Sequence, residues 1–327
     1  MHPKASAFHQ PGWLAALTRT YGYQLFAITS TPAGKPLLDG IILCRVSSWI
    51  TGTRAVSLPF SDHCDPLVTD ANGLSQFTER LADECDRQHW KYVELRPRAW
   101  DGDVRTRFSG SQSFCFHKLD LTQSFERIFR GFHRDSIQRK IRRAEKEKLS
   151  YEVGRTDQLQ EEFYSLLLMT RRRHRLLPQP RAWFKNLMEC LGEESQIRIA
   201  RKDGVPIAAM LTLRHRSSVI YKYGCSDERS HNLGGVPFLF WKLIEESKNS
   251  GAEELDLGRS DYDNDGLITF KDRFGTQKLS LTYLRYPRAK ETKTLSGWTQ
   301  RSMGRLFSFL PDTVSPTVGK VLYRHMG

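Results

Sequence analysis

Lys271 is the residue of this sequence best placed to do chemistry. The spacing of Leu267, Phe270 and Phe274 predicts a short helix with one apolar face, and Lys271 lies at the edge of that face. A lysine in such a place can lay its methylene stem along the core and direct its ammonium into a cleft. The alternative is a surface lysine whose ammonium simply stays in water.

A strand is expected shortly before that helix. Leu255 and Leu257 alternate with polar residues over 253–258, which is typical of a half-buried strand. Asp256, Arg259 and the following Ser260 then stand at the end of this strand. Asp256 can act as a proton acceptor, or it can form a structural ion pair with Arg259.

A glycine turn is expected at the start of a second helix. Asn232, Gly234 and Gly235 stand directly before a run of apolar residues at helical spacing. Glycines let backbone N–H groups come close to a ligand, and the positive end of a helix favours a phosphate. We therefore expect the turn from Arg229 to Gly235 to bind the anionic part of a donor, with an ordinary helix start as the alternative.

The aspartates between these elements resemble a calcium-binding loop. Asp261, Asp263, Asp265 and Asp272 have nearly the spacing of a twelve-residue calcium loop. The segment that enters the loop is strand-like, the last ligand is a short Asp where a bidentate Glu is usual, and Lys271 would lie inside the loop. We therefore expect no metal at these residues.

The cysteines give no sign of a metal site or a disulfide framework. They are scattered, without a C-x-x-C pair or a histidine at metal-ligand spacing, at Cys44, Cys64, Cys85, Cys115, Cys190 and Cys225. The sequence also has no apolar run long enough to span a bilayer and no signal-peptide pattern near its start. These features predict a cytoplasmic protein that can lie peripherally at the inner membrane surface.

The order of these segments resembles the C-terminal half of FemAB-like proteins. The shared order is N-x-G-G, an amphipathic helix, G-A-x-x-x-D-x-G-R-S, an acidic loop and G-L-x-x-F-K-x-x-F-G. FemAB-like proteins are double-domain members of the GNAT N-acyltransferase superfamily, related to the Fem aminoacyltransferases of cell-wall synthesis. The resemblance extends upstream to His9-Gln10-x-x-Trp13, to 57–60 and to 139–147, so it covers most of residues 8–287.

The resemblance implies a fold and an activity. It implies a mixed α/β (α+β) fold with two tandem GNAT-like domains, each a mixed twisted sheet flanked by helices. The implied activity is transfer of an acyl or aminoacyl group to an amine of a cell-envelope or polysaccharide precursor, so that the acceptor is a small-molecule, glycan or peptide amine. In the related Fem transferases a lysine of the F-K segment stabilises charge in the transition state, and by resemblance that role falls on Lys271.

Two donors remain open. The superfamily pattern R/Q-x-x-G-x-G/A cradles the pyrophosphate of CoA, but Arg229 and Gly234 do not have its spacing. Only Asn232-x-Gly234-Gly235 follows the FemAB-like form. The donor is therefore acyl-CoA or aminoacyl-tRNA, and tRNA is a candidate partner.

Basic residues gather in three stretches of a chain whose net charge is +13. Ten basic and four acidic residues lie between Arg127 and Arg155, either as a solvated helix or as a face that steers anions. The run Arg171–Arg175 either caps a helix or binds phosphate. The basic amphipathic tail at 288–327 either docks on the protein or contacts anionic lipid.

These stretches define the expected domains. We expect an N-terminal GNAT-like domain at 1–121, a basic helical linker at 122–150, a C-terminal GNAT-like domain with the donor site at 151–287 and the tail at 288–327. A function of another class also fits the charge. The chain could be a non-catalytic binding module for RNA or anionic membrane lipid.

Overall fold

The computed structural model describes all residues except 1, 50, 101–103, 289–321 and 326–327. The predicted tail at 288–327 therefore lies almost wholly outside the described residues. The chain forms two compact units, one built from Met1–Phe114 and the segment that starts at Ser280, the other from Cys115–Leu279. Among the described helices, none combines the length and the apolar character that crossing a bilayer requires.

Unit 1 is a mixed sheet with one long helix against it. Its strand order is β1-β2-β3-β4-β11, and the β3–β4 pair is parallel while its neighbours are antiparallel. Its elements are η1 (Ala7–His9), α1 (Pro11–Tyr21), β1 (Gln24–Ile28), β2 (Ile41–Val46), β3 (Arg54–Val56), α2 (Ala71–Arg87), β4 (Val93–Leu95) and most of β11 (Gln277–Tyr286).

Unit 2 repeats this plan on a larger scale. Its strand order is β5-β10-β9-β8-β7-β6, and the β9–β10 pair is parallel while the other pairs are antiparallel. Its elements are the end of β5 (Ser109–Asp120), α3 (Phe125–Gly131), η2 (Arg134–Gln138), α4 (Arg139–Lys146), β6 (Ser150–Gly154), α5 (Asp157–Arg173), α6 (Arg181–Leu191), η3 (Gly192–Glu194), β7 (Ser195–Lys202), β8 (Val205–His215), β9 (Ser218–Ser226), η4 (Glu228–Leu233), α7 (Gly235–Asn249), β10 (Glu254–Ser260) and α8 (Asp265–Asp272).

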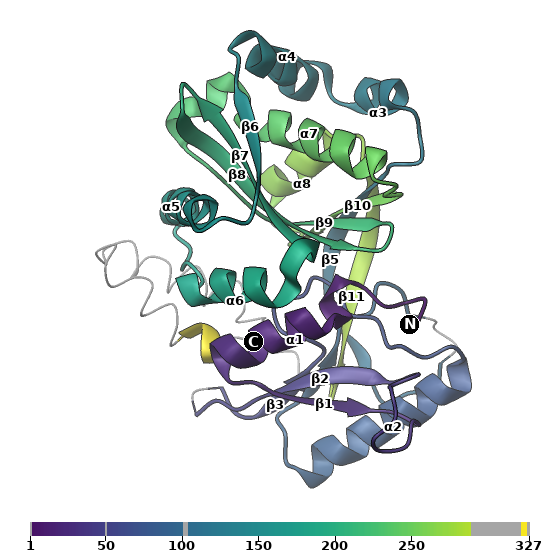
Figure 1. Cartoon of the computed structure of the whole chain (residues 1–327). Coiled ribbons are helices and arrows are strands. Elements are labelled where there is room, and N and C mark those ends of the chain that lie inside the picture. Colours follow the sequence, from purple (N-terminus) through teal and green to yellow (C-terminus); the bar gives the residue numbers. More distant parts are fainter. Residues whose placement is uncertain (1, 50, 101–103, 289–321, 326–327) are drawn as a thin grey trace. The chain divides into compact units, whose positions relative to one another are not determined.

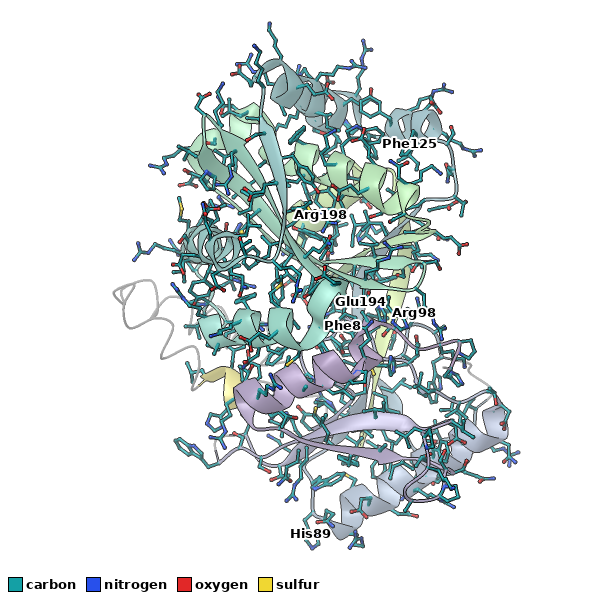
Figure 2. All side chains as sticks on the ribbon, in the orientation of Figure 1. Phe8, His89, Arg98, Phe125, Glu194 and Arg198 are labelled. Carbon is teal, nitrogen blue, oxygen red and sulfur yellow. The ribbon has the colours of Figure 1, made fainter. Side chains whose placement is uncertain are left out.

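Helices cover both faces of the unit 2 sheet. Helix α7 lies on one face, and α5 and α6 lie on the other (Figure 1). Side chains alternate along β7, so that Ile197 and Ile199 face one way while Arg198 faces α7 and forms an ion pair of 3.2 Å with Glu246 (Figure 2). The sheet is thus buried on both sides, as its long apolar strands require.

The basic stretch predicted as a linker folds within unit 2. Residues 122–150 form α3, a π-helical turn at η2, and α4, which lies against α7. Ile128, Phe132, Ile141 and Ala144 are buried in the same apolar cluster as Leu243 of α7. The apolar positions of this stretch are therefore part of a core, and its charged positions face outward.

Replacing Ile141 tests this packing. Ile141 is 1% exposed, so Ile141→Ala leaves a cavity between α4 and α7 and should lower the free energy of unfolding by about 2–5 kcal/mol. Lys146→Ala, an exposed position on the same helix, should change it by less than about 0.5 kcal/mol. Urea unfolding of both variants measures the difference, and equal small effects would contradict the assignment of α4 to the core.

Candidate active site

Strands β9 and β10 pair over a short distance and then separate. The parallel pairs run from Ser218 with Glu254 to Ile220 with Asp256. All residues from 218 to 260 are described, and no β9–β10 pairs follow, although β9 continues to Ser226 and β10 to Ser260. Beyond Ile220 the two facing strand edges therefore have backbone polar groups that do not pair with each other, and such groups need other partners.

A bulge turns β9 where the separation begins. The β8–β9 register shifts between Leu211 and Thr212, which adds one residue to β9. As a result Tyr221 packs on Phe240 of α7 with ring centroids 4.7 Å apart, while Tyr223 accepts a hydrogen bond from Trp183 of α6 on the other face. Two tyrosines that normal alternation would place on one face thus lie on opposite faces.

The turn after β9 leads directly into α7. Gly234 caps the helix with a left-handed backbone, φ +81°, and a Cβ at this position would lie 2.3 Å from the carbonyl oxygen of Lys140 in α4. Gly235 lies against Ile207 and Ala208 of β8. Both glycines are needed for close packing, so α4 covers part of the turn that we expected to be open to an anion.

The first N–H groups of α7 have no hydrogen-bond acceptor within the helix. The first bond of the helix joins the N–H of Phe238 to the oxygen of Gly234, so the N–H groups of Gly235 and Val236 have no acceptor one turn earlier. Asn232 is exposed beside them. Arg229 is also exposed, but its guanidinium forms a two-pronged ion pair with Asp227 that lowers the pKa of this carboxyl.

Hydrogen bonds join the end of α5 to the end of β9, a contact that the sequence does not predict. Thr170 exchanges hydrogen bonds with the backbone of Ser226, and Arg173 donates to the carbonyl oxygen of Ser226 at 3.3 Å. The hydroxyl of Ser226 lies 2.9 Å from His231 Nε2. The basic run at 171–175 was a signal for this site, but only the fold brings it to the turn before α7.

Nearby cations act on His231 and His174 more strongly than the nearby acidic side chains do. The pKa of His231 lies below its ordinary value, first because the ring is partly buried and then because Arg173 and Lys140 repel a further positive charge. The pKa of His174 is lowered in the same way, by burial and then by Arg173 and Arg171. An anion at this turn would meet helix N–H groups and several cations together.

Lys271 lies beneath the separated end of β10. Its side chain is 3% exposed, and its ammonium donates to the carbonyl oxygens of Gly258 and Arg259 at 2.9 and 3.0 Å. The ammonium is therefore bound by backbone oxygens and does not stay in water, which was the alternative that the sequence left open. Its charge is fixed at the strand end by backbone dipoles.

Asp256 and Arg259 lie on either side of a second irregularity. The β5–β10 register shifts between Asp256 and Arg259, and Asp256, 1% exposed, accepts a hydrogen bond of 2.6 Å from the N–H of Gly258. The carboxylate thus stabilises the bulge next to Gly258 and Arg259, whose carbonyl oxygens accept the hydrogen bonds of Lys271. The side chain of Arg259 is partly exposed at the same strand end.

Aromatic packing joins the two halves of the site. Phe240, in the second turn of α7, contacts Phe270 and Phe274 with centroids 5.9 and 4.6 Å away. These two phenylalanines flank Lys271 in the sequence, so the helix that begins at the glycine turn packs directly on the segment that carries the lysine. The structure therefore brings Gly234, Gly235 and Lys271 onto adjoining elements of unit 2.

The acidic loop makes other contacts. Asp272 Oδ1 lies within hydrogen-bond distance of His117 Nε2, at 2.9 Å, and Asp272 forms an ion pair with Lys278 at 3.7 Å. Asn264 caps α8 through the N–H of Leu267. Within the described part of the chain, no group of three or more His, Cys, Asp or Glu side chains is placed to hold a metal ion.

Two glycines with the same φ angle allow the cost of backbone strain to be measured separately from the cost of close packing at the turn. Gly204, in the β7–β8 turn, also has φ +81° but nothing within 4 Å of its Cβ position. We expect Gly204→Ala to cost about 1–2 kcal/mol from the left-handed backbone alone, and Gly234→Ala about 1–3 kcal/mol more because of the contact with α4. Urea unfolding compares them, and equal losses would show that α4 does not press on Gly234.

The histidines of unit 2 predict how stability depends on pH. Burial is the first cause that lowers the pKa below 6.5 at His117, His174, His215 and His231. As pH falls through about 6.5, the unfolded chain binds protons that these native side chains do not, so the free energy of unfolding should decrease. His117→Gln should reduce the slope between about pH 6.5 and 5.5 in urea unfolding; an unchanged slope contradicts the assignment.

The comparisons with known proteins agree with this geometry. Residues 131–271 match the family described as acetyltransferase (GNAT) domain, a region that runs from the end of α3 to Lys271. No curated protein sequence matches the chain. Beyond the family match, the similarity to known proteins is therefore structural.

Solved structures share the fold over most of the chain. FemX is 14% identical with a TM-score of 0.68, covering 87% of this chain and 93% of its own. L-PGS from Bacillus licheniformis is 14% identical with a TM-score of 0.57, covering 91% and 96%. A tandem GNAT protein from the clavulanic acid biosynthesis pathway is 10% identical with a TM-score of 0.51, covering 88% and 91%.

Because these identities are low, the neighbours show a shared fold only. They do not show which substrates this chain uses. The predicted mixed α/β class with GNAT-like domains is confirmed. The predicted resemblance to FemAB-like proteins of the GNAT superfamily is confirmed as well, since residues 131–271 match the GNAT acetyltransferase domain and FemX shares the fold.

Proposed function

We propose that this protein is an N-acyltransferase that moves an acyl or aminoacyl group from acyl-CoA or aminoacyl-tRNA to an amine. The acceptor amine belongs to a cell-envelope or polysaccharide precursor, a choice that rests on the resemblance to FemAB-like proteins. The observation that carries the proposal is the separation of β9 and β10 beside the start of α7.

The separated strands fit an extended donor. Their facing edges offer N–H and C=O groups that do not pair with each other beyond Ile220 and Asp256. An acyl donor with amide groups along its length could take these hydrogen bonds, as an added strand would. Its phosphate would then lie at the N–H groups of Gly235 and Val236, near Arg173 and His231.

The reaction asks for positioning more than for a nucleophilic side chain. A neutral amine attacks the acyl carbonyl, the C–S or C–O bond to the donor breaks, the amine loses a proton and the leaving thiolate or alkoxide takes one up. Holding the two reactants in line accounts for much of the rate. A fixed positive charge that favours the oxyanion intermediate contributes further.

We assign these tasks to the residues at the end of β10. The ammonium of Lys271 supplies the fixed charge, with its position set by the oxygens of Gly258 and Arg259. Asp256 acts as a positioning residue, because its carboxylate is engaged with the N–H of Gly258. Arg259, partly exposed, contacts the acceptor or the acyl group, while Arg229 and Asn232 extend the anion site.

A transfer assay tests the function. The protein is incubated with acyl-CoA, or separately with charged tRNA, in the presence of candidate amines, and products are followed by mass. A mass increase on the amine with either donor supports the proposal and identifies the donor. Transfer from neither donor, together with salt-sensitive RNA binding, would instead support a non-catalytic binding module.

Lys271→Met tests the assignment of the charge. We expect kcat to fall by about 10²–10³, the usual cost of one electrostatic group, with a smaller effect on donor binding. Lys278→Met, at an exposed lysine on the following strand, is the matched control and should stay within about twofold. Thermal unfolding of both variants checks the fold, and full activity of a folded Lys271→Met protein rules the assignment out.

A further inference from the structure

The α3–α4 hairpin carries a dense set of exposed cations that the proposed site does not use. We call it the basic α3–α4 face, and its members are Arg127, Arg130, Arg134, Arg139, Arg142, Arg143, Lys146 and Lys148. Figure 2 shows nitrogen-tipped side chains that extend from α3 and α4 into solvent. These helices are anchored in unit 2 by their apolar sides, so the charged sides have a fixed orientation.

Few of these charges are neutralised within the protein. Arg143 pairs with Glu147 at 2.6 Å, and Arg139 pairs with Asp135 at 3.7 Å while both side chains stay mostly exposed. Arg127, Arg130, Arg134, Arg142, Lys146 and Lys148 have no ion-pair partner among the described residues. The face therefore presents a net positive field that an anionic surface would attract.

The apolar residues of the same hairpin are not available to a partner. Phe125 and Phe129 pack edge-to-face against Trp241, with centroids 6.2 and 5.1 Å away. None of the large hydrophobic residues that the described structure exposes lies between 125 and 148. The face thus offers charge alone, without a wedge to insert into a bilayer and without exposed rings on which single-stranded bases could stack.

We propose that the basic α3–α4 face binds the surface of an anionic membrane. A cluster of four to eight Lys and Arg residues is enough for such binding, and each residue near the lipid headgroups raises the membrane affinity by roughly a factor of five. The contact is electrostatic and reversible, because nothing on the face enters the hydrocarbon. The carbonyl oxygen of Lys140 in α4 lies over Gly234, so a membrane bound to this face would lie close to the proposed donor site.

Vesicle sedimentation tests the proposal with the full chain. We expect binding to vesicles of equal parts phosphatidylglycerol and phosphatidylcholine at low salt, and no binding to pure phosphatidylcholine. Raising the salt to about 0.5 M should release the protein, because exposed charges are then screened. Failure to bind the anionic vesicles at low salt overturns the proposal.

Matched charge reversals locate the contact. The triple variant Arg130→Glu, Arg134→Glu, Lys146→Glu should bind the anionic vesicles at least about 100-fold more weakly. Lys35→Glu, Arg80→Glu, Arg105→Glu makes the same change of net charge at exposed positions of unit 1 and should bind nearly as the parent does. Equal weakening of both triples overturns the proposal, because binding then follows net charge and not this face.

Nucleic acid is the rival partner, and the same variants decide it. A fluorescent RNA duplex is titrated with the parent protein and with both triple variants. RNA that binds the parent but not the hairpin variant, while anionic vesicles bind neither, assigns the face to RNA and overturns the membrane proposal. Vesicle binding that the hairpin variant alone loses supports it. None of these readouts depends on acyl transfer, so failure of the proposed function leaves the result intact.

Discussion

The buried ammonium of Lys271 fixes the end of β10, because it donates hydrogen bonds to the carbonyl oxygens of Gly258 and Arg259. A buried charge is tolerated only when such partners surround it. On its other side β10 pairs with β5 as far as Ser260. The strand end is therefore held by β5 and by α8, and it makes no pairs with β9 beyond Asp256.

Two glycines set how closely the other side of the site can pack. The hydroxyl of Tyr221 lies 1.8 Å from the place where a Cβ of residue 224 would be, so only glycine lets this ring lie along β9. Gly234 performs the same task between α7 and α4. In both places a side chain would clash with a neighbouring residue, so glycine is needed for packing. This need is independent of whether a ligand can reach the turn.

Sequence patterns predicted the elements better than their partners. The strand expected over 253–258 and the helix expected after the glycine turn are present as β10 and α7, because apolar periodicity and turn glycines are local signals. Periodicity gives the face of a strand but not its neighbour, so the separation of β9 and β10 was not predicted. The hydrogen-bond partners of Lys271 were not predicted for the same reason, because they depend on how α8 is rotated against β10.

Helix α4 links the charged surface to the turn before α7. With eight residues and like charges at i and i+4, as at Arg139 with Arg143 and Arg142 with Lys146, it would not be stable alone. It is held by burial of its apolar residues on α7, against the repulsion of its own cations. An anionic partner that screens those cations would lower this opposing free energy. Because α4 also presses on Gly234 through Lys140, such a partner would at the same time stabilise the geometry of the turn where the donor is proposed to bind.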